Sequence, residues 1–150
     1  MGEAIFDDAV DRSSILDGKV KVDSAGTFAC EGTEATPNAI KAVEEMGLHI
    51  EKHKAKQIDE ELVDWADLIL TMEATHFEQI EAMFPKAEPK MHTLMGYAKG
   101  EYGYPGNLGF DVEDPYGDDL DEYRSSAQQI AVLIQAVVEK LEEQQLAEEQ

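Results

Sequence analysis

The stretch Ala66-Asp-Leu-Ile-Leu-Thr-Met-Glu73 contains the clearest β-strand signal of this chain. Its apolar run Leu68–Leu70 is short and bounded by charge, which is typical of a strand buried on both faces of a parallel sheet. A short helix is predicted before it, over Glu60–Trp65, and a second helix after it, over Thr75–Met83, which Pro85 ends. This alternation of helices and strands predicts an α/β fold.

Upstream, the chain predicts one helix and one further strand. Residues 2–12 place apolar side chains on one helical face. Lys19-Val-Lys-Val-Asp-Ser24 alternates apolar and polar residues as a strand does, and Gly26 follows it. We therefore expect Ser24 at the carboxyl end of a strand, the edge at which open α/β sheets build their sites.

Two more elements and a loop follow from local signals. Thr36 is a good N-cap with Pro37 at the first helical position, and Gly47 ends the helix that they begin. Met91–Leu94 predicts a weaker strand. The glycine-rich residues 96–109 predict a long loop, and loops of this length are usually functional or mobile.

The last helix has the strongest periodicity. Its apolar positions alternate four- and three-residue steps and form one face: Tyr123, Ala127, Ile130, Ile134, Val137 and Leu141. The Glu- and Gln-rich tail from about residue 142 is expected to fray. No repeat and no linker divides the chain, so we expect one domain over residues 1–150, a three-layer sandwich with a mostly parallel central sheet.

Composition restricts the partners and the compartment. Lys and Arg number 12 against 33 Asp and Glu, and the resulting net charge of −21 argues against nucleic acid or an anionic membrane as a partner. No stretch approaches the roughly 20 apolar residues of a membrane span, and the first residues do not resemble a secretory signal. Cys30 is the single cysteine, which excludes an internal disulfide and fits a reducing compartment. We expect a cytoplasmic protein.

Two separate stretches carry a family resemblance. Asp111-Val-Glu-Asp-Pro-Tyr-Gly117 and Val22-Asp-Ser-Ala-Gly-Thr27 resemble the low-molecular-weight protein-tyrosine-phosphatase family. Further matching segments extend the resemblance over nearly the whole chain: Thr36-Pro-Asn-Ala39, Gly47-Leu-His-Ile50, His53-Lys-Ala-Lys-Gln-Ile58 and Ala66–Glu73. The resemblance implies hydrolysis of protein phosphomonoesters through a cysteinyl-phosphate intermediate, without a metal or another cofactor.

The part of the family that carries its nucleophile has no counterpart in these residues. Family members begin with a short strand and a Cys-x5-Arg-Ser-Pro phosphate loop, followed by a helix similar to Met1-Gly-Glu-Ala-Ile-Phe6. We therefore expect the first strand and the phosphate loop to be missing and the chain as given to be inactive. An internal Met taken as a start codon would produce this N-terminus, and we favour that explanation over an evolved loss.

Asp114 and Tyr116 are the first candidate site residues. Pro115 biases Asp114 toward an extended conformation, so its carboxylate is presented from a stiff turn. The resemblance implies that Asp114 is the acid that protonates the leaving group and that Tyr116 walls the substrate pocket. The alternative is an ordinary turn in an acidic loop, because seven of the twelve residues from Asp111 to Glu122 are acidic.

The resemblance also implies that Ser24 supports the phosphate loop by hydrogen bonding. For this chain without that loop, we expect Ser24 only to cap the end of a strand.

Cys30 is rejected as the nucleophile. A phosphatase thiolate needs an Arg a few residues later to hold the phosphoryl oxygens, whereas Cys30 is followed by acids, and the two arginines, Arg12 and Arg124, follow no cysteine. The four histidines have no convincing metal-ligand spacing.

Several alternatives stay open at this point. Some bacterial members of the family hydrolyse phosphoarginine, and the residue that discriminates the substrates lies in the absent loop, so the sequence does not choose between phosphotyrosine and phosphoarginine. A non-catalytic pseudophosphatase that binds phosphoproteins is the rival function. An arsenate reductase would need further cysteines. Expected partners are a phosphorylated protein or a small phosphomonoester, together with self-association through unpaired strand edges.

Overall fold

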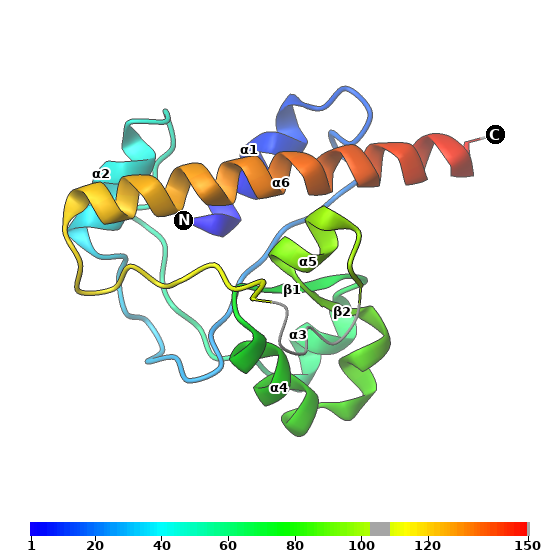
Figure 1. Ribbon diagram of the computed structural model, residues 1–150, viewed down its shortest axis with the longest axis horizontal. Helices are drawn as coiled ribbons and strands as arrows, with labels where there is room; N and C mark the ends of the chain where they lie inside the picture. The colour runs from blue at the N-terminus through cyan, green and yellow to red at the C-terminus, as the bar shows by residue number, and fades with distance from the viewer. Residues whose placement is uncertain (103–108, 150) are drawn as a thin grey trace. The chain divides into compact units, whose positions relative to one another are not determined.

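The computed structural model describes residues 1–102 and 109–149 (Figure 1). Contacts divide the chain into two compact units. The first unit comprises Met1–Ser24, Glu34–His53 and Asp114–Gln150, and the second comprises Ala25–Thr33 and Lys54–Glu113. The expectation of a single domain over residues 1–150 stays a prediction.

The first unit is built from three helices. Helix α1 spans Gly2–Arg12, as the sequence predicts, α2 spans Pro37–Glu44, and α6 spans Leu120–Glu148; α1 and α2 both pack against α6. Figure 1 shows α6 running along the other two helices. The buried side chains of the unit come from all three helices and include Ile5, Val10, Val43, Ile130, Ile134 and Val137. The apolar faces predicted from sequence therefore form this core.

Local capping sets the limits of α2 and the start of α6. Thr36 Oγ1 accepts a hydrogen bond from Ala39 N at 3.3 Å, and Pro37 occupies the first turn. After α2, Gly47 takes a φ of 82°, and Leu48 N donates to Val43 O at 2.9 Å, as in a Schellman motif. Asp119 caps α6 by accepting from Glu122 N at 3.0 Å.

The C-terminal part of α6 differs from expectation in its length. The structure continues the helix to Glu148, beyond the last apolar residue of the periodic face, Leu141. Ser13 Oγ donates to Glu142 Oε2 at 2.9 Å, and Lys19 Nζ lies 2.7 Å from Glu149 Oε1. These contacts hold the last turns to the segment after α1. Fraying of the residues from about 142 in solution stays a prediction.

The strand predicted over Lys19–Ser24 is not formed. Burial alternates along it as the sequence pattern predicts, with Val20 and Val22 half-buried and Lys21 exposed. However, none of the described residues pairs with this segment in a ladder, and a strand needs those hydrogen bonds. The first pairing comes two residues later, in an isolated parallel bridge between Gly26 and Gln57.

The second unit contains the sheet. Strand β1 is Ile69–Thr71 and strand β2 is Met91–Thr93, and they pair in parallel with Leu70 opposite His92. Helix α3 (Glu60–Trp65) precedes β1, while α4 (Ala74–Met83) and the 3₁₀ helix η1 (Pro85–Lys90) connect the two strands. The predictions for α3, β1, α4 and β2 are confirmed within one residue at each boundary, whereas η1 was not predicted. Two strands joined by a helical crossover form the parallel α/β arrangement that the sequence predicts.

An apolar cluster holds this unit together. Val63 of α3, Phe77 and Ile80 of α4, Ala87 of η1 and Met91 of β2 are all buried and in mutual contact. Ile58, Ile69 and Phe84 pack around them. The helices therefore cover the sheet through side chains that the sequence pattern marks as apolar.

The predicted loop over residues 96–109 is wrong at its start. Helix α5 spans Leu94–Lys99, because Thr93 Oγ1 accepts from Gly96 N at 3.0 Å and begins a helix there. Gly96 is required by close packing, since a Cβ at this position would lie 2.6 Å from Thr93 Oγ1 and 2.8 Å from Glu101 O. Residues 103–108 of the predicted loop lie outside the described residues.

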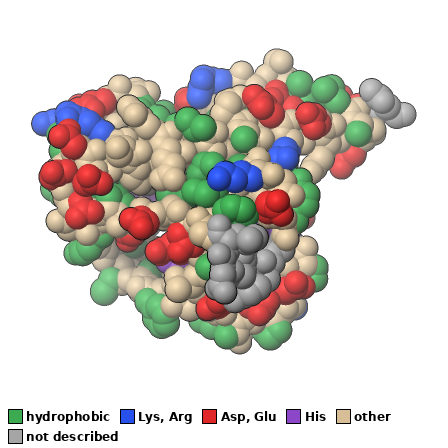
Figure 2. Space-filling view, viewed as in Figure 1, with side chains coloured by type: hydrophobic (Ala, Val, Ile, Leu, Met, Phe, Trp, Pro, Cys, Tyr) green, Lys and Arg blue, Asp and Glu red, His purple; other side chains and the backbone are tan. Residues whose placement is uncertain are grey.

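Within residues 1–102 and 109–149, no helix is both long enough and apolar enough to cross a membrane. Asp and Glu side chains are spread over the face drawn in Figure 2, in keeping with the acidic composition.

Candidate active site

Asp114 lies in a short turn that leads into α6. Its Oδ1 accepts a hydrogen bond from Tyr116 N at 3.0 Å, and Asp118 N donates to Pro115 O at 2.8 Å. The first of these bonds forms an Asx turn, which fixes the carboxylate relative to the backbone. Asp114 is exposed, and its Oδ2 accepts no hydrogen bond from the residues that the structure describes. That oxygen is available to carry a proton.

Tyr116 and Gly117 complete the same turn. Tyr116 is 76% exposed. Gly117 takes a φ of 85°, which favours glycine and lets the chain reverse toward α6. Asn38 Nδ2 of α2 donates to Asp118 O at 3.3 Å. The turn thus places an exposed ring two residues after a held carboxylate.

The residues just before Asp114 are anchored in the second unit. Val112 N donates to Met72 O at 2.7 Å, immediately after β1, and Asp111 Oδ1 accepts from Ala74 N, the first residue of α4, at 2.8 Å. Val112 is buried. Asp111 therefore caps a helix, and the acidic loop begins at the carboxyl end of a parallel strand, where α/β proteins bind their ligands.

Ser24 lies in a different group of residues. Its Oγ donates to Glu3 Oε1 of α1 at 2.8 Å, and Glu3 Oε2 lies 3.7 Å from His53 Nδ1, an ion-pair distance if the imidazole is protonated. No hydrogen bond joins Ser24 to Asp114 among the described residues. The structure therefore joins Ser24 to the first turn of α1.

Glu3 was missed by the sequence reasoning. It joins two segments more than 20 residues apart from each other, so no local spacing indicates its role. A weak signal existed, because Glu3 lies within the stretch Met1–Phe6 that resembles the family and occupies the first turn of a predicted helix.

Among the described residues of its unit, Cys30 has no arginine that could hold a phosphoryl group. It is exposed and is followed by Glu31, whose carboxylate accepts from Gln57 N. Both arginines belong to the first unit and are already ion-paired: Arg12 Nε lies 2.8 Å from Asp8 Oδ2, and Arg124 makes two hydrogen bonds with Glu45, at 2.8 and 2.7 Å. The rejection of Cys30 from sequence is consistent with these contacts.

No group of three or more His, Cys, Asp or Glu side chains that could hold a metal occurs among the residues with a described structure. The chemistry at the Asp114 turn is that of a carboxylic acid beside an aromatic ring. Such a group could transfer a proton to or from a bound substrate.

The described elements define an α/β protein, and comparisons with known proteins define its family. The chain belongs to the low molecular weight phosphotyrosine protein phosphatase family, whose model matches residues 1–148. A protein-arginine-phosphatase of Geobacillus stearothermophilus is 35% identical over 126 residues, which are 84% of this chain and 80% of that protein. The protein-arginine-phosphatase of Bacillus subtilis is 32% identical over 94% of this chain and 87% of its own length.

Tyrosine phosphatases are also among the relatives. The low molecular weight protein-tyrosine-phosphatase Wzb of Escherichia coli is 39% identical over 98 residues, 65% of this chain and 60% of that protein. Among solved structures, the YwlE arginine phosphatase from Geobacillus stearothermophilus superposes with a TM-score of 0.83 and 32% identity, covering 97% of this chain and 86% of the other. A low molecular weight protein tyrosine phosphatase from T. tengcongensis gives a TM-score of 0.78 and 34% identity, with coverages of 93% and 88%. The resemblance inferred from the motifs and the α/β fold class are thus confirmed.

Proposed function

We propose that this protein hydrolyses phosphorylated protein side chains, phosphotyrosine or phosphoarginine, with Asp114 as the proton donor. The observation that carries the proposal is the Asp114 turn, with one carboxylate oxygen bound to Tyr116 N and the other unpartnered among the described residues, in a chain of this family. The arginine phosphatases among its relatives support phosphoarginine as a substrate to be tested beside phosphotyrosine.

The proposed reaction has two steps and needs the family's Cys-x5-Arg loop ahead of α1. A cysteine thiolate attacks phosphorus, the bond to the substrate oxygen or nitrogen breaks, and Asp114 gives its proton to that leaving atom. Asp114 then removes a proton from water, which attacks phosphorus and releases phosphate and the thiolate. Tyr116 provides a ring on which the substrate side chain can stack.

The N-terminal turn of α1 is the proposed neighbour of the phosphoryl group. A helix N-terminus carries about half a positive charge and stabilises anions. A thiol placed there has a lowered pKa, as the nucleophile requires. In this proposal Ser24 and Glu3 belong to the support of that region, through the 2.8 Å hydrogen bond between them.

A non-catalytic binding module is the second candidate for the 150 residues alone. The specific observation is that Cys30 has no Arg in the following residues, while Arg12 and Arg124 are both paired with carboxylates. The upstream coding sequence separates the candidates, because a Cys-x5-Arg motif in frame contradicts a pseudophosphatase.

The 150-residue polypeptide is predicted to show no turnover of p-nitrophenyl phosphate, because no thiolate with an arginine clamp is present to form the covalent intermediate. Steady-state assays with wild type and Cys30→Ser should both remain at the background rate. Turnover that Cys30→Ser abolishes, or phosphate trapped on Cys30 in a denatured digest, would contradict this expectation.

In a protein extended by the family's first strand and phosphate loop, Asp114→Asn is predicted to lower kcat by about 10²–10⁴ with little change in substrate binding, because only proton transfer in the transition state is lost. Asp118→Asn is the matched control, since the structure uses the backbone of Asp118 in the turn. Assays with phosphotyrosine and phosphoarginine peptides assign the substrate. Full activity of Asp114→Asn toward a substrate with a poor leaving group would mean that Asp114 is a turn residue only.

A further inference from the structure

The first unit contains a cavity that includes neither the Asp114 turn nor the Ser24 group. It has a volume of about 320 Å³ and lies between α1, α6 and the turn that follows α2. Its apolar lining consists of Ile5, Ala9, Met46, Leu48 and Ala131. The volume is at the lower end of the range of small-molecule sites, roughly 300–1,000 Å³.

Short side chains account for the space. Ala9 of α1 and Ala131 of α6 line the cavity where these two helices pack, and each contributes only a methyl group. Met46, which is 40% exposed, also lines the cavity and has an unbranched, adaptable side chain. The cavity can therefore take a compact apolar group of the size of a single ring.

Three polar side chains complete the lining: Asp8, Arg12 and Gln135. Arg12 Nε donates to Asp8 Oδ2 at 2.8 Å, which leaves Asp8 Oδ1 without a hydrogen bond from the described part of the chain. The carboxamide of Gln135 likewise forms no hydrogen bond with any described residue. Two oxygen acceptors, a carboxylate and an amide, thus border an apolar space.

The border itself carries one carboxylate, Asp8, and one guanidinium, Arg12, and further aspartates lie close to them in sequence outside the lining. Asp7 and Asp11 flank Asp8 on α1, and Asp17 follows the helix. The like charge of Asp7, together with smaller effects of Asp17 and Asp8, raises the pKa of the exposed Asp11 carboxyl. An anionic ligand would face these carboxylates, whereas a cation would reduce their mutual repulsion.

We propose that this cavity binds a small organic cation whose apolar body contacts Ala9 and Ala131 and whose amidinium, guanidinium or ammonium group donates hydrogen bonds to Asp8 and Gln135. A hydrated metal ion would not use the apolar lining. The proposal is independent of the phosphatase chemistry, because none of these residues belongs to the Asp114 turn or to the Ser24 group.

Benzamidine is the probe, since it combines one ring with an amidinium cation, and benzamide is its neutral counterpart of similar shape. Titration of the ¹⁵N-labelled 150-residue polypeptide should give saturable shifts of amide resonances in α1 and α6, with a Kd on the order of 1 mM for benzamidine. Benzamide should bind at least about tenfold more weakly, because it lacks the charge-assisted hydrogen bond.

Variants test the apolar lining and the carboxylate of the site separately. Ala131→Phe should fill the cavity and abolish saturable binding, and circular dichroism verifies that this variant is folded. If it does not fold, Ala131→Met is the substitute, a smaller change that should weaken the binding. Asp8→Asn should weaken benzamidine binding by about tenfold and leave benzamide unaffected. Asp17→Asn is the control, because it removes the same charge from outside the lining, and it should change the Kd by less than about twofold.

The proposal is overturned if benzamide binds as tightly as benzamidine, or if binding persists in folded Ala131→Phe. It is also overturned if Asp17→Asn weakens binding as much as Asp8→Asn does, since that result indicates a general charge effect. The proposal is likewise overturned if benzamidine shows no saturable binding to the wild-type polypeptide.

Discussion

The structure shows the surroundings of His92, which its neighbours in the sequence do not indicate. His92 lies in the middle of β2, half-buried, with its ring centroid 5.0 Å from that of Tyr97 and 5.5 Å from that of Tyr102. The sequence presented His92 as one of four histidines without a role. Its surroundings make it an aromatic packing residue of the second unit.

This packing predicts a pH dependence of stability. Burial lowers the pKa of His92, and the Glu88 carboxylate opposes the shift. The unfolded chain, with a histidine pKa of about 6.5, then binds a proton more readily than the folded chain, so His92 costs stability as pH falls below about 6.5. Urea denaturation of wild type and His92→Gln at several pH values should show that wild type loses stability relative to the variant between about pH 7.5 and 5.5. A difference that stays constant over this range would contradict the prediction.

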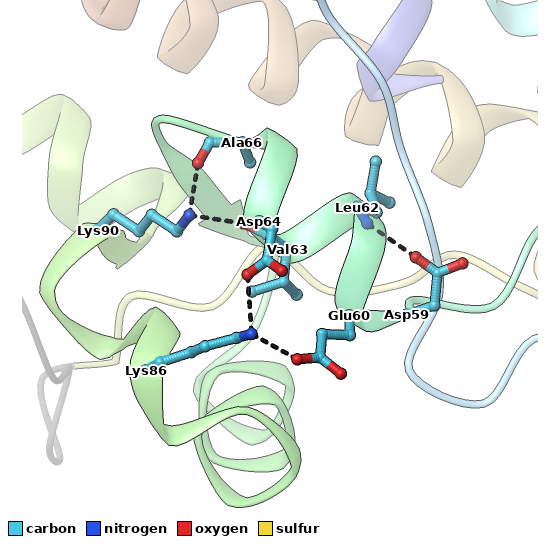
Figure 3. Close-up of polar contacts among 8 residues, drawn as sticks. All are labelled: Asp59, Glu60, Leu62, Val63, Asp64, Ala66, Lys86 and Lys90. Carbon is cyan, nitrogen blue, oxygen red and sulfur yellow. Dashed lines mark hydrogen bonds and ion pairs between the residues drawn. The ribbon is translucent and has the colours of Figure 1, made fainter.

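At the scale of an element, α3 depends on contacts at both of its ends. Asp59 caps its start by accepting from Leu62 N at 2.8 Å. At its other end Lys90 Nζ donates to the carbonyl oxygens of Val63 and Ala66, both at 2.6 Å (Figure 3). A helix of six residues is too short to be stable alone, so these contacts attach it to the segment that leads into β2.

Lys90→Met is predicted to lower the free energy of unfolding by about 1–3 kcal/mol, because two carbonyl groups at the end of α3 lose a charged donor while the aliphatic packing is kept. Lys86→Met is the matched control. Lys86 is exposed and forms ion pairs with Glu60 and Asp64, at 2.7 and 2.8 Å (Figure 3), and exposed pairs contribute little. Urea denaturation should show a clearly larger loss for Lys90→Met, and equal losses would mean that the contacts of Lys90 do not stabilise α3.

At the scale of the whole molecule, the described sheet has two strands and therefore two open edges. The segment Lys19–Ser24 has a strand-like sequence and forms no ladder with the described residues. A strand-like segment outside a sheet, like an open sheet edge, can pair with another chain. The 150-residue polypeptide is therefore expected to self-associate through strand pairing.

Sedimentation velocity should show an average sedimentation coefficient that rises with protein concentration. Lys21→Pro should reduce the association, because it removes an exposed N–H donor from the middle of the segment Lys19–Ser24. A monomer at all concentrations, or equal association of the Lys21→Pro variant, would rule out pairing through this segment.

The sequence alone determined what depends on neighbours a few residues apart. The span of α1, the cap of α2 at Thr36 and Pro37, and the span of α3 follow from helical periodicity, capping and chain reversal, which act within one or two turns. The motif around Asp114, together with Val22–Thr27 and the other matching segments, also placed the chain in its family. The role of Asp114 itself stays a prediction.

Only the tertiary structure decided the features that join distant segments. Alternation made Lys19–Ser24 strand-like, but a strand exists only where another segment supplies its hydrogen bonds. Glu142 and Glu149, at the C-terminal end of α6, contact Ser13 and Lys19, and Ser24 contacts Glu3 across 21 positions of sequence. Such contacts form because packing brings the segments together, and local propensity carries no information about which segments will meet.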